Sequence, residues 1–402
     1  MHEVTIEKLD NQGRGICYLN NKITFVENAL PTEKVKINLT KESKKFNEAI
    51  VTEYITKSTS RVESPCPYFN ICGGCELLNL SYKDTCNYKK EKLEGILSKY
   101  ANIKTDIEII ESKNNLNYRN KITLKVEKGK YGYYENKSHK LIEIKKCLLA
   151  EPAITNFLND IEKLNIKNGE VIIRSNYNSE LLIWIKTKDN INPDIPYLKK
   201  KHKIAGIILN DKPIDGDPSF IEIINHQLFT VSYDSFFQVN RDICSKLFNL
   251  VNKHIKDYET ILDLYCGVGT LGINATKKAK KAFGIEIVKN AVLNAITNSK
   301  INKRDNIYYM LGDVAECLPK IKDKIDTIIV DPPRAGLDKV TKQTIIDFKP
   351  HKIIYVSCDP MTLARDLKEL SSYYNIIEVK GLDMFPHTQH IECLVVLYRR
   401  WG

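Results

Sequence analysis

The sequence predicts an α/β protein whose carboxy-terminal part is built on a parallel sheet. After residue 229, apolar runs with the length of buried strands alternate with amphipathic stretches that have the period of helices. This is the pattern of parallel strands joined by helical crossovers. Before that residue the segments are mostly strand-like, with few helical pieces. We therefore expect three parts, with boundaries at 1–57, 58–228 and 229–402.

Residues 1–57 have the pattern of a small, OB-like β-barrel. Short stretches such as 22–26 and 34–37 alternate apolar and polar residues, and turn residues separate them. Lysines give the predicted barrel a basic face: Lys34, Lys36, Lys41, Lys44 and Lys45. This face either binds a polyanion or is simply solvated.

Composition bounds the class of function. The chain has 402 residues, of which 43% are hydrophobic, and no apolar run is long enough to span a bilayer. Its first residues lack a secretion signal, so we expect a cytoplasmic protein with no membrane partner. The formal net charge of +11 favours a polyanionic partner such as nucleic acid. Eleven cysteines in such a chain indicate metal binding or thiolate chemistry rather than disulfides.

Three cysteines cluster in an irregular segment rich in glycine and proline: Cys66, Cys72 and Cys75. A fourth thiolate is available from Cys86 or from Cys147. Four thiolates hold either a zinc ion or an iron–sulfur cluster. Because structural zinc usually has two paired Cys-x-x-Cys units and this chain has one, the spacing favours a 4Fe–4S cluster.

A glycine-rich turn follows the first predicted strand of the carboxy-terminal part. Gly267 lies in this turn, and a helix begins directly after it, so the backbone can approach a ligand there. The second strand ends in Glu286, at the spacing of a carboxylate that binds ribose hydroxyls. The third ends near Asp313, which is placed to accept a hydrogen bond from an adenine amine. Asp263 precedes the turn, and the Gly-x-Gly-x-x-Gly fingerprint is lacking, so the site is more similar to S-adenosylmethionine-dependent methyltransferases than to NAD-dependent dehydrogenases.

Cys358 is a candidate nucleophile. It follows a predicted strand at 353–356 and precedes a predicted helix at 362–370. A thiol at the carboxyl end of such a strand faces the ligand cleft of an α/β sheet, and we expect the nearby helix N-terminus to favour its thiolate form. The alternative is a buried structural cysteine.

Five motifs together resemble the RNA uracil-C5 methyltransferases of the 23S ribosomal RNA type. They are Phe236-Phe-Gln-Val-Asn240, Asp263-Leu-Tyr-Cys-Gly-Val-Gly269, Asp331-Pro-Pro-Arg-Ala-Gly336, Val356-Ser-Cys-Asp-Pro360 and Asp383-Met-Phe-Pro-His-Thr-Gln-His-Ile-Glu392. The resemblance covers essentially the whole chain. It implies an amino-terminal TRAM barrel, a central α+β domain with an iron–sulfur cluster on Cys66, Cys72, Cys75 and Cys147, and a Rossmann-like domain that binds S-adenosylmethionine.

The resemblance also implies roles for single residues. Gln238, Tyr265, Glu286 and Asp331 line the cleft for cofactor and substrate, Cys358 is the nucleophile that adds to carbon 6 of uracil, and Glu392 is the base that removes the proton from carbon 5. A carboxylate at Asp331 can accept the N3–H of uracil, where cytosine has a bare acceptor. For the RNA itself we expect contacts from Arg119, in the basic segment 118–121, and stacking on Phe237 or its neighbour Phe236.

Three other functions compete with the 23S ribosomal RNA enzyme, which we expect to act as a monomer. The related transfer-RNA uracil-C5 enzymes are expected to lack the barrel and the cluster, so the presence of both favours ribosomal RNA. An RNA cytosine-C5 methyltransferase uses the same thiolate addition, but the role of Asp331 disfavours it. A non-catalytic RNA-binding or RNA-folding protein is the third alternative.

Overall fold

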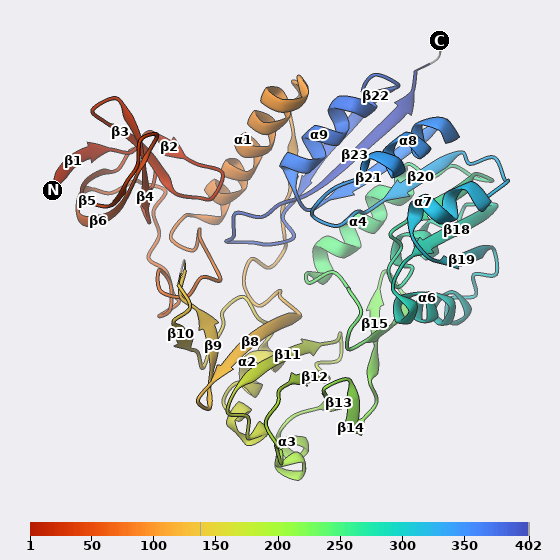
Figure 1. Ribbon diagram of the computed structural model, residues 1–402, viewed down its shortest axis with the longest axis horizontal. Helices are drawn as coiled ribbons and strands as arrows, with labels where there is room; N and C mark the ends of the chain where they lie inside the picture. Colours follow the sequence, from red (N-terminus) through yellow and green to blue (C-terminus); the bar gives the residue numbers. More distant parts are fainter. Residues whose placement is uncertain (137, 401–402) are drawn as a thin grey trace.

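The amino-terminal part of the protein is a strongly curved six-stranded sheet. A computed structural model describes residues 1–136 and 138–400 of the chain, and this sheet is set apart from the rest of the molecule (Figure 1). Its strand order is β1-β5-β6-β4-β3-β2. The strands are β1 (His2–Thr5), β2 (Lys8–Leu9), β3 (Gly15–Leu19), β4 (Lys22–Glu27), β5 (Lys34–Glu42) and β6 (Asn47–Thr56). Alternate side chains such as Val35 and Ile37 fill its interior, as the alternation in the sequence predicts.

The central part is a seven-stranded sheet in the order β10-β9-β8-β11-β12-β13-β14. Its strands are β8 (Lys121–Glu127), β9 (Lys130–Tyr134), β10 (Leu141–Glu143), β11 (Gly169–Ser175), β12 (Leu181–Lys186), β13 (Ile204–Leu209) and β14 (Lys212–Gly216). One face is covered by short helices, namely α2 (Pro152–Phe157), η1 (Ile161–Leu164) and α3 (Ile195–Lys201). The core on that face includes Leu124, Ile173 and Ile183, which come from three adjacent strands.

The carboxy-terminal part contains an eight-stranded sheet in the order β19-β18-β17-β20-β21-β23-β22-β7. The strands are β7 (Glu108–Ile110), β17 (Thr260–Leu264), β18 (Lys281–Glu286), β19 (Ile307–Leu311), β20 (Thr327–Val330), β21 (Lys352–Ser357), β22 (Tyr374–Leu382) and β23 (Glu392–Arg399). The strands from β19 to β21 are parallel, whereas β23 runs antiparallel to β21. The predicted α/β class is therefore confirmed.

Helices cover both faces of this sheet. One face packs α1 (Tyr82–Ala101), α7 (Val314–Cys317), α8 (Lys339–Phe348) and α9 (Pro360–Leu370), and η2 (Leu318–Lys320) follows α7. The other packs α4 (Arg241–Lys253), α5 (Thr270–Ala275), α6 (Lys289–Ile301) and the hairpin of β15 (Ser219–Ile224) and β16 (Gln227–Ser232). Successive residues of β21 alternate between the two cores, with Ile353 and Tyr355 in the first and Ile354 and Val356 in the second. A sheet buried on both faces explains why its strands are continuous apolar runs.

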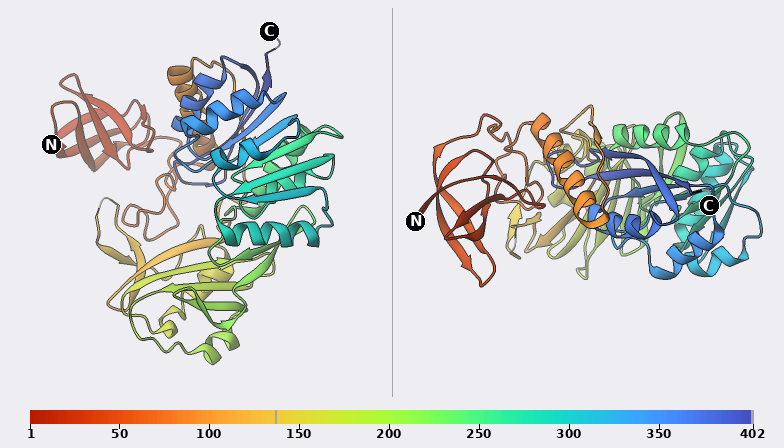
Figure 2. Two further views of the ribbon diagram at one scale, coloured as in Figure 1. Left: turned by 45° about the vertical axis from the view of Figure 1, so that its right-hand side comes forward. Right: turned by 90° about the horizontal axis from the view of Figure 1, so that it is seen from above.

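One early segment lies with the carboxy-terminal sheet. Although 58–228 was expected to be a single central part, α1 packs along α9, and β7 adds to the sheet edge by pairing in parallel with β22. Both views of Figure 2 show α1 against the carboxy-terminal part. The chain thus enters that part, leaves it to form the central sheet, and returns. In residues 1–136 and 138–400, no helix is both long and apolar enough to cross a membrane.

Candidate active site

The candidate side chains lie together where the parallel strands of the eight-stranded sheet end. This follows from the direction of the strands. The carboxyl ends of the parallel strands β17 to β21 share that edge, and β23 begins there because it is antiparallel. Asp331 follows β20, Cys358 follows β21, and Glu392 is the first residue of β23. Ser357 and Cys393 are register partners, so the residues next to them, Cys358 and Glu392, lie across from one another. Three residues that are far apart in the sequence therefore meet.

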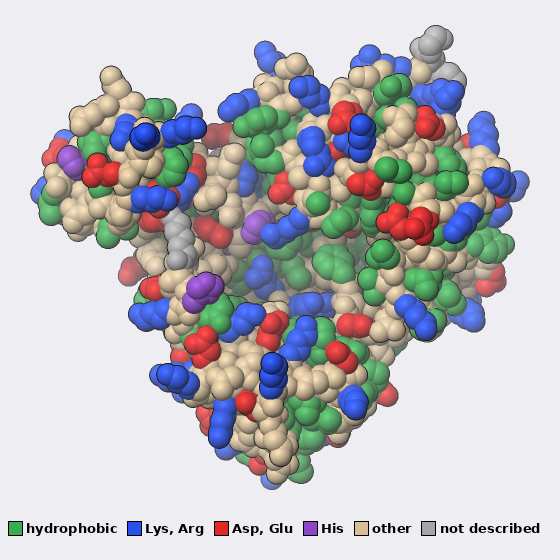
Figure 3. All heavy atoms as spheres, viewed as in Figure 1, with side chains coloured by type: hydrophobic (Ala, Val, Ile, Leu, Met, Phe, Trp, Pro, Cys, Tyr) green, Lys and Arg blue, Asp and Glu red, His purple; other side chains and the backbone are tan. Residues whose placement is uncertain are grey.

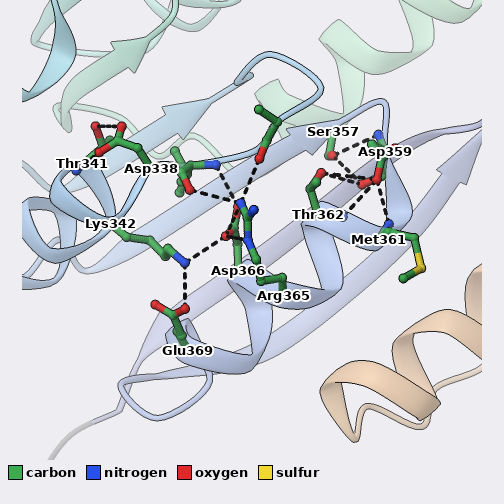
Figure 4. A network of polar contacts seen from close by, with 12 residues as sticks. Asp338, Thr341, Lys342, Ser357, Asp359, Met361, Thr362, Arg365, Asp366 and Glu369 are labelled. Carbon is green, nitrogen blue, oxygen red and sulfur yellow. Dashed lines mark hydrogen bonds and ion pairs between the residues drawn. The ribbon is translucent and has the colours of Figure 1, made fainter.

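The Cys358 thiol is half-buried and holds its proton strongly. Burial, together with the carboxyl groups of Glu392 and Asp331, which repel a thiolate, raises its pKa to about 11. The N-terminus of α9 does not stabilise the thiolate in the way that the sequence predicts. Asp359 caps α9 instead, and its Oδ1 accepts the N–H groups of Met361 and Thr362, at 2.9 Å each (Figure 4). The donors expected to favour the thiolate are thus already used.

Glu392 and Asp331 form a coupled pair of carboxyl groups. Glu392 is only 2% exposed, and its Oε1 has no hydrogen-bond partner in the described part of the chain. Burial, and then the charge of Asp331, hold the pKa of Glu392 well above its usual range, while Arg334 acts in the opposite direction. Burial also raises the pKa of Asp331. Two acids in such a position retain a proton under conditions where exposed carboxylates are ionised.

The loop that follows Asp331 is fastened to α9 by residues that the sequence did not single out. Asp366 is fully buried, and its Oδ2 accepts the N–H of Leu337 and the hydroxyl of Tyr355, both at 2.8 Å. Arg365 donates to the carbonyl of Ala335 at 2.9 Å. Figure 4 shows these contacts converging on α9. Because α9 also follows Cys358 directly, one helix positions both the thiol and the Asp331 loop.

A second loop, residues 383–391, leads into Glu392 and is held from several sides. Asp383 forms an ion pair at 2.5 Å with Lys89 of α1, and neither side chain is exposed. Lys89 also donates to the carbonyl of Phe385 at 2.9 Å. The N–H of Gln389 donates to Glu76, at 3.1 Å, which directly follows Cys75 in the sequence. The cysteine-rich segment and α1 thus both fix the loop that ends at Glu392.

A pocket with an empty volume of about 400 Å³ lies beside these residues. Four of the residues expected to line the cleft, together with an aromatic neighbour, contribute to its wall: Gln238, Tyr265, Gly267, Asp331 and Phe237. Asp263 also lines it, and its buried Oδ1 has no partner among the described residues. Burial raises the pKa of Asp263 to about 8. An unpaired buried acceptor and a second acid in one wall suit a ligand that carries positive charge, as S-adenosylmethionine does.

Two residues expected at the cofactor lie outside this wall. Glu286 accepts the N–H of Gly267 at 3.0 Å and that of Val288 at 2.8 Å. Its carboxylate therefore holds the backbone of the glycine-rich turn. Asp313 is exposed and caps α7, where its Oδ1 accepts the N–H of Ala315 at 2.8 Å. The side chain of Asp313 is therefore engaged in a helix cap rather than free for an adenine amine.

The residues expected at the RNA also need revision. Phe237 is 4% exposed, and its ring centroid lies 6.0 Å from that of Phe229, so it belongs to the core. Phe236 is 66% exposed, so of these two neighbours it is the ring available for stacking. Arg119 is half-buried beside the cysteine-rich segment, and its buried Nε has no partner in the described residues.

The four predicted cluster ligands line one cavity with an empty volume of about 550 Å³: Cys66, Cys72, Cys75 and Cys147. Cys86 is elsewhere, buried in α1 with its Sγ 4.0 Å from Asp383. In the part of the chain that the structure describes, no group of three or more His, Cys, Asp or Glu side chains is placed to hold a metal ion. The spacing alone leaves Cys86 and Cys147 open as the fourth thiol, the resemblance implies Cys147, and the fold brings Cys147 to the cavity of the other three.

The α/β fold and the pocket lined by Gln238, Tyr265, Gly267 and Asp331 define an S-adenosylmethionine-dependent methyltransferase. A family model described as tRNA (Uracil-5-)-methyltransferase matches residues 221–400, and a TRAM domain model matches residues 2–52. An uncharacterized RNA methyltransferase of Clostridium tetani is 31% identical over 98% of this chain and 96% of its own length. Another, of Thermotoga maritima, is 32% identical over 99% of each chain. The protein therefore belongs to the RNA uracil-C5 methyltransferase family and is an S-adenosylmethionine-dependent enzyme, which sets aside the cytosine-specific and non-catalytic alternatives.

A solved structure is similar over nearly the whole chain. The Pyrococcus abyssi tRNA (uracil-54, C5)-methyltransferase, in complex with S-adenosyl-L-homocysteine, gives a TM-score of 0.82 at 25% identity, covering 98% of this chain and 99% of that one. Coverage of this extent includes most of the amino-terminal sheet. The expectation that transfer-RNA enzymes lack the barrel is therefore wrong for this neighbour. The barrel does not distinguish ribosomal from transfer RNA.

Proposed function

We propose that the enzyme methylates carbon 5 of a uridine in structured RNA through a covalent bond between Cys358 and carbon 6. The observation that carries this proposal is the register of β21 and β23, which places Cys358 across from Glu392 beside the cofactor pocket. A thiol, a base and a carboxyl that can recognise uracil are thus within one site.

Carbon 5 of uracil is a weak nucleophile until carbon 6 is attacked. Loss of the thiol proton to solvent gives the Cys358 thiolate, and its addition to carbon 6 gives an enolate whose negative charge is shared with carbon 5. S-adenosylmethionine supplies a sulfonium-bound methyl group, which carbon 5 takes, leaving S-adenosylhomocysteine. Glu392 then accepts the proton of carbon 5, the bond between carbon 6 and sulfur breaks, and the thiolate leaves. The raised pKa of Glu392 makes its carboxylate a stronger base for this step.

Asp331 has a separate role in selecting the base. Its carboxylate accepts the N3–H of uracil, whereas the N3 of cytosine offers no proton. The following residues, Pro332 and Pro333, stiffen the loop, and the contacts of Asp366 and Arg365 hold it on α9. Gln238, Tyr265 and Gly267 hold the methyl donor, and Glu286 positions Gly267.

Four thiols around one cavity support a 4Fe–4S cluster held by Cys66, Cys72, Cys75 and Cys147. When bound, the cluster would link the segment 66–75 covalently to Cys147, which lies between β10 and α2 of the central part. Glu76, next to Cys75, would pass that constraint to the loop before Glu392.

The covalent mechanism is tested with RNA that contains 5-fluorouridine. Fluorine at carbon 5 cannot leave as a proton, so an enzyme that adds Cys358 to the base becomes trapped on the RNA when S-adenosylmethionine is present. We expect a band resistant to denaturation that requires both the methyl donor and Cys358. Normal methylation of uridine RNA without any trapped band on the fluorinated RNA would contradict the mechanism.

We propose 23S ribosomal RNA as the target, on the strength of the motif pattern, and transfer RNA as the second candidate. The second is favoured by the similarity of the whole chain to the Pyrococcus abyssi enzyme. Unmodified 23S and transfer-RNA transcripts, offered in competition with a tritiated methyl donor, separate the two. Mapping 5-methyluridine in both RNAs from cells without the gene gives the matching result in vivo.

A further inference from the structure

The face of the central sheet opposite α2, η1 and α3 carries positive charges from three neighbouring strands. The opposite face packs on α2, η1 and α3, so outward residues alternate with core residues along each strand. Lys121 of β8 is the register partner of Arg174 of β11, and Lys186 of β12 is the partner of Glu170, which lies four residues before Arg174 in β11. Register partners share a face, so the three cations lie on the same side of the sheet.

Arg174 is the most unusual member of this group. Its side chain is 4% exposed, and Nη2 donates to the carbonyl of Ser235 at 3.0 Å. Nε and Nη1 are buried without a hydrogen-bond partner in residues 1–136 and 138–400. Burial lowers the pKa of this guanidinium to about 10. A buried guanidinium with unused donors is costly unless a ligand completes its hydrogen bonds.

Lys121 is in a similar position. Burial, together with the charges of Arg174 and Lys186, lowers the pKa of its ammonium to about 8. Glu170 acts in the opposite direction on Lys121, but it already forms an ion pair with Lys125 at 2.8 Å. Glu222 acts in the same way on Arg174, but it is already paired with Arg241 at 2.8 Å, so both carboxylates that face this group are engaged elsewhere. An anionic ligand would remove the repulsion among the three cations.

The cations lie next to the methylation site. Arg174 contacts Ser235, which directly precedes the exposed Phe236. Asn120, next to Lys121, donates from its backbone to Val239 at 2.9 Å and from its side chain to the carbonyl of Gln238 at 3.1 Å. In Figure 3, Lys and Arg side chains line the hollow between the central and carboxy-terminal parts. The positive face is therefore continuous with the loop that borders the cofactor pocket.

We propose that Lys121, Arg174 and Lys186 bind the phosphate backbone of the RNA strand that carries the target uridine. The proposal rests on the proposed function and adds to it a surface that holds the strand on the side of Phe236. The guanidinium of Arg174 can donate hydrogen bonds to two oxygens of one phosphate, and the ammonium groups of the two lysines attract phosphates as point charges. Lys121 and Lys186 are two strands and four residues apart, or about 10 Å across and about 13 Å along the sheet, which leaves room for more than one phosphate.

The test is the salt dependence of binding to a short fluorescent oligouridylate, measured by anisotropy without the methyl donor. Each phosphate contact that is lost reduces the slope of log affinity against log salt by about 0.7 for a single strand. We expect a reduction of this size for Lys121→Gln and for Lys186→Gln, and a larger one for Arg174→Gln. Lys200→Gln is the control, because this exposed lysine lies on α3, which covers the opposite face of the central sheet. The slope of this control should equal that of the unaltered protein.

Unchanged slopes for Lys121→Gln and Lys186→Gln would overturn the proposal, and because Lys186 is exposed, this holds even if Arg174→Gln fails to fold. The same variants should raise the KM for RNA more than they lower kcat. A slope change with inorganic polyphosphate but no rise in the KM for RNA would also overturn it, since the face would then be a general anion site. Trapping of the enzyme on 5-fluorouridine RNA tests the role of Cys358 independently of the salt dependence of binding. Reduced slopes without trapping would reject the covalent mechanism and keep this surface.

Discussion

Ser357 of β21 is the register partner of Cys393 of β23, and this pairing determines which side chains face one another at the ends of the two strands. It sets Cys358 and Glu392 opposite one another at the sheet edge where the cofactor pocket opens. A shift of one residue in the register would turn Glu392 to the other face of the sheet. The chemistry therefore depends on the buried apolar residues that fix this register, such as Val395 and Leu397.

Replacing the thiol should abolish methyl transfer. We expect Cys358→Ala to bind S-adenosylmethionine within several-fold of the unaltered enzyme, because Cys358 is outside the wall of the cofactor pocket. Transfer of tritium from the methyl donor to RNA measures turnover, and equilibrium dialysis measures binding. Cys17→Ala, in the interior of the amino-terminal sheet, serves as the control. Turnover by Cys358→Ala near that of the control would reject Cys358 as the nucleophile.

The thiol should become reactive only at high pH in the free enzyme. With a pKa of about 11, its alkylation by iodoacetamide should rise about tenfold per pH unit through the neutral range. Glu392→Gln should shift this profile to lower pH, because the carboxylate that repels the thiolate is removed. Cys358→Ala gives the background from the other ten thiols. A profile centred near neutral pH would mean that the ligand-free protein already activates the thiol.

Much of the site could be predicted because its signals are local. Cys358 and Asp331 each follow a short apolar run that ends in turn residues, and Gly267 lies between a strand and a helix. These patterns place a residue at the end of a strand. Strands of one parallel sheet then bring their ends to a common edge, so local assignments suffice to predict that the residues meet.

What escaped prediction depends on contacts between distant segments. β7 is three residues long and pairs with β22. Asp366 lies inside a regular helix, where its spacing gives no indication that it holds the Asp331 loop. The sequence predicts a lowered pKa for Cys358, whereas the structure raises it. The motif does not show that the side chain of Asp359 accepts the N–H groups at the start of α9, or that two carboxyl groups lie near the thiol.

The cysteine cavity should contain about four irons per chain when the protein is purified without oxygen. Cys147→Ala should lose the iron together with its broad visible absorption. Cys86→Ala should keep both, because Cys86 lies in α1 away from the cavity. Iron analysis and absorption spectra provide the measurement. Stoichiometric zinc without iron in the unaltered protein would reject the cluster.

Glu392→Gln should stop the reaction after the methyl group has been transferred. The amide has nearly the same shape as the acid but cannot take the proton of carbon 5, so Cys358 cannot leave. A denaturing gel should then show protein joined to ordinary uridine RNA. The double variant Glu392→Gln with Cys358→Ala is the control and should show no such band. Rapid turnover by Glu392→Gln without an adduct would exclude Glu392 as the base.

Asp331→Asn should weaken the preference for uridine. An amide can turn its NH₂ toward the bare N3 of cytosine as readily as its oxygen toward the N3–H of uracil. Loss of a hydrogen bond to a charged group should also cost about 1.5–3 kcal/mol with uridine RNA, or roughly one to two decades in kcat/KM. The measurement is competitive turnover on matched RNAs that carry U or C at the target position. Asp347→Asn, an exposed acid near the end of α8, controls for general effects of removing a carboxylate in this region. If Asp331→Asn keeps full activity and full preference, the carboxyl of Asp331 does not contact N3, and the pocket selects uracil through other groups.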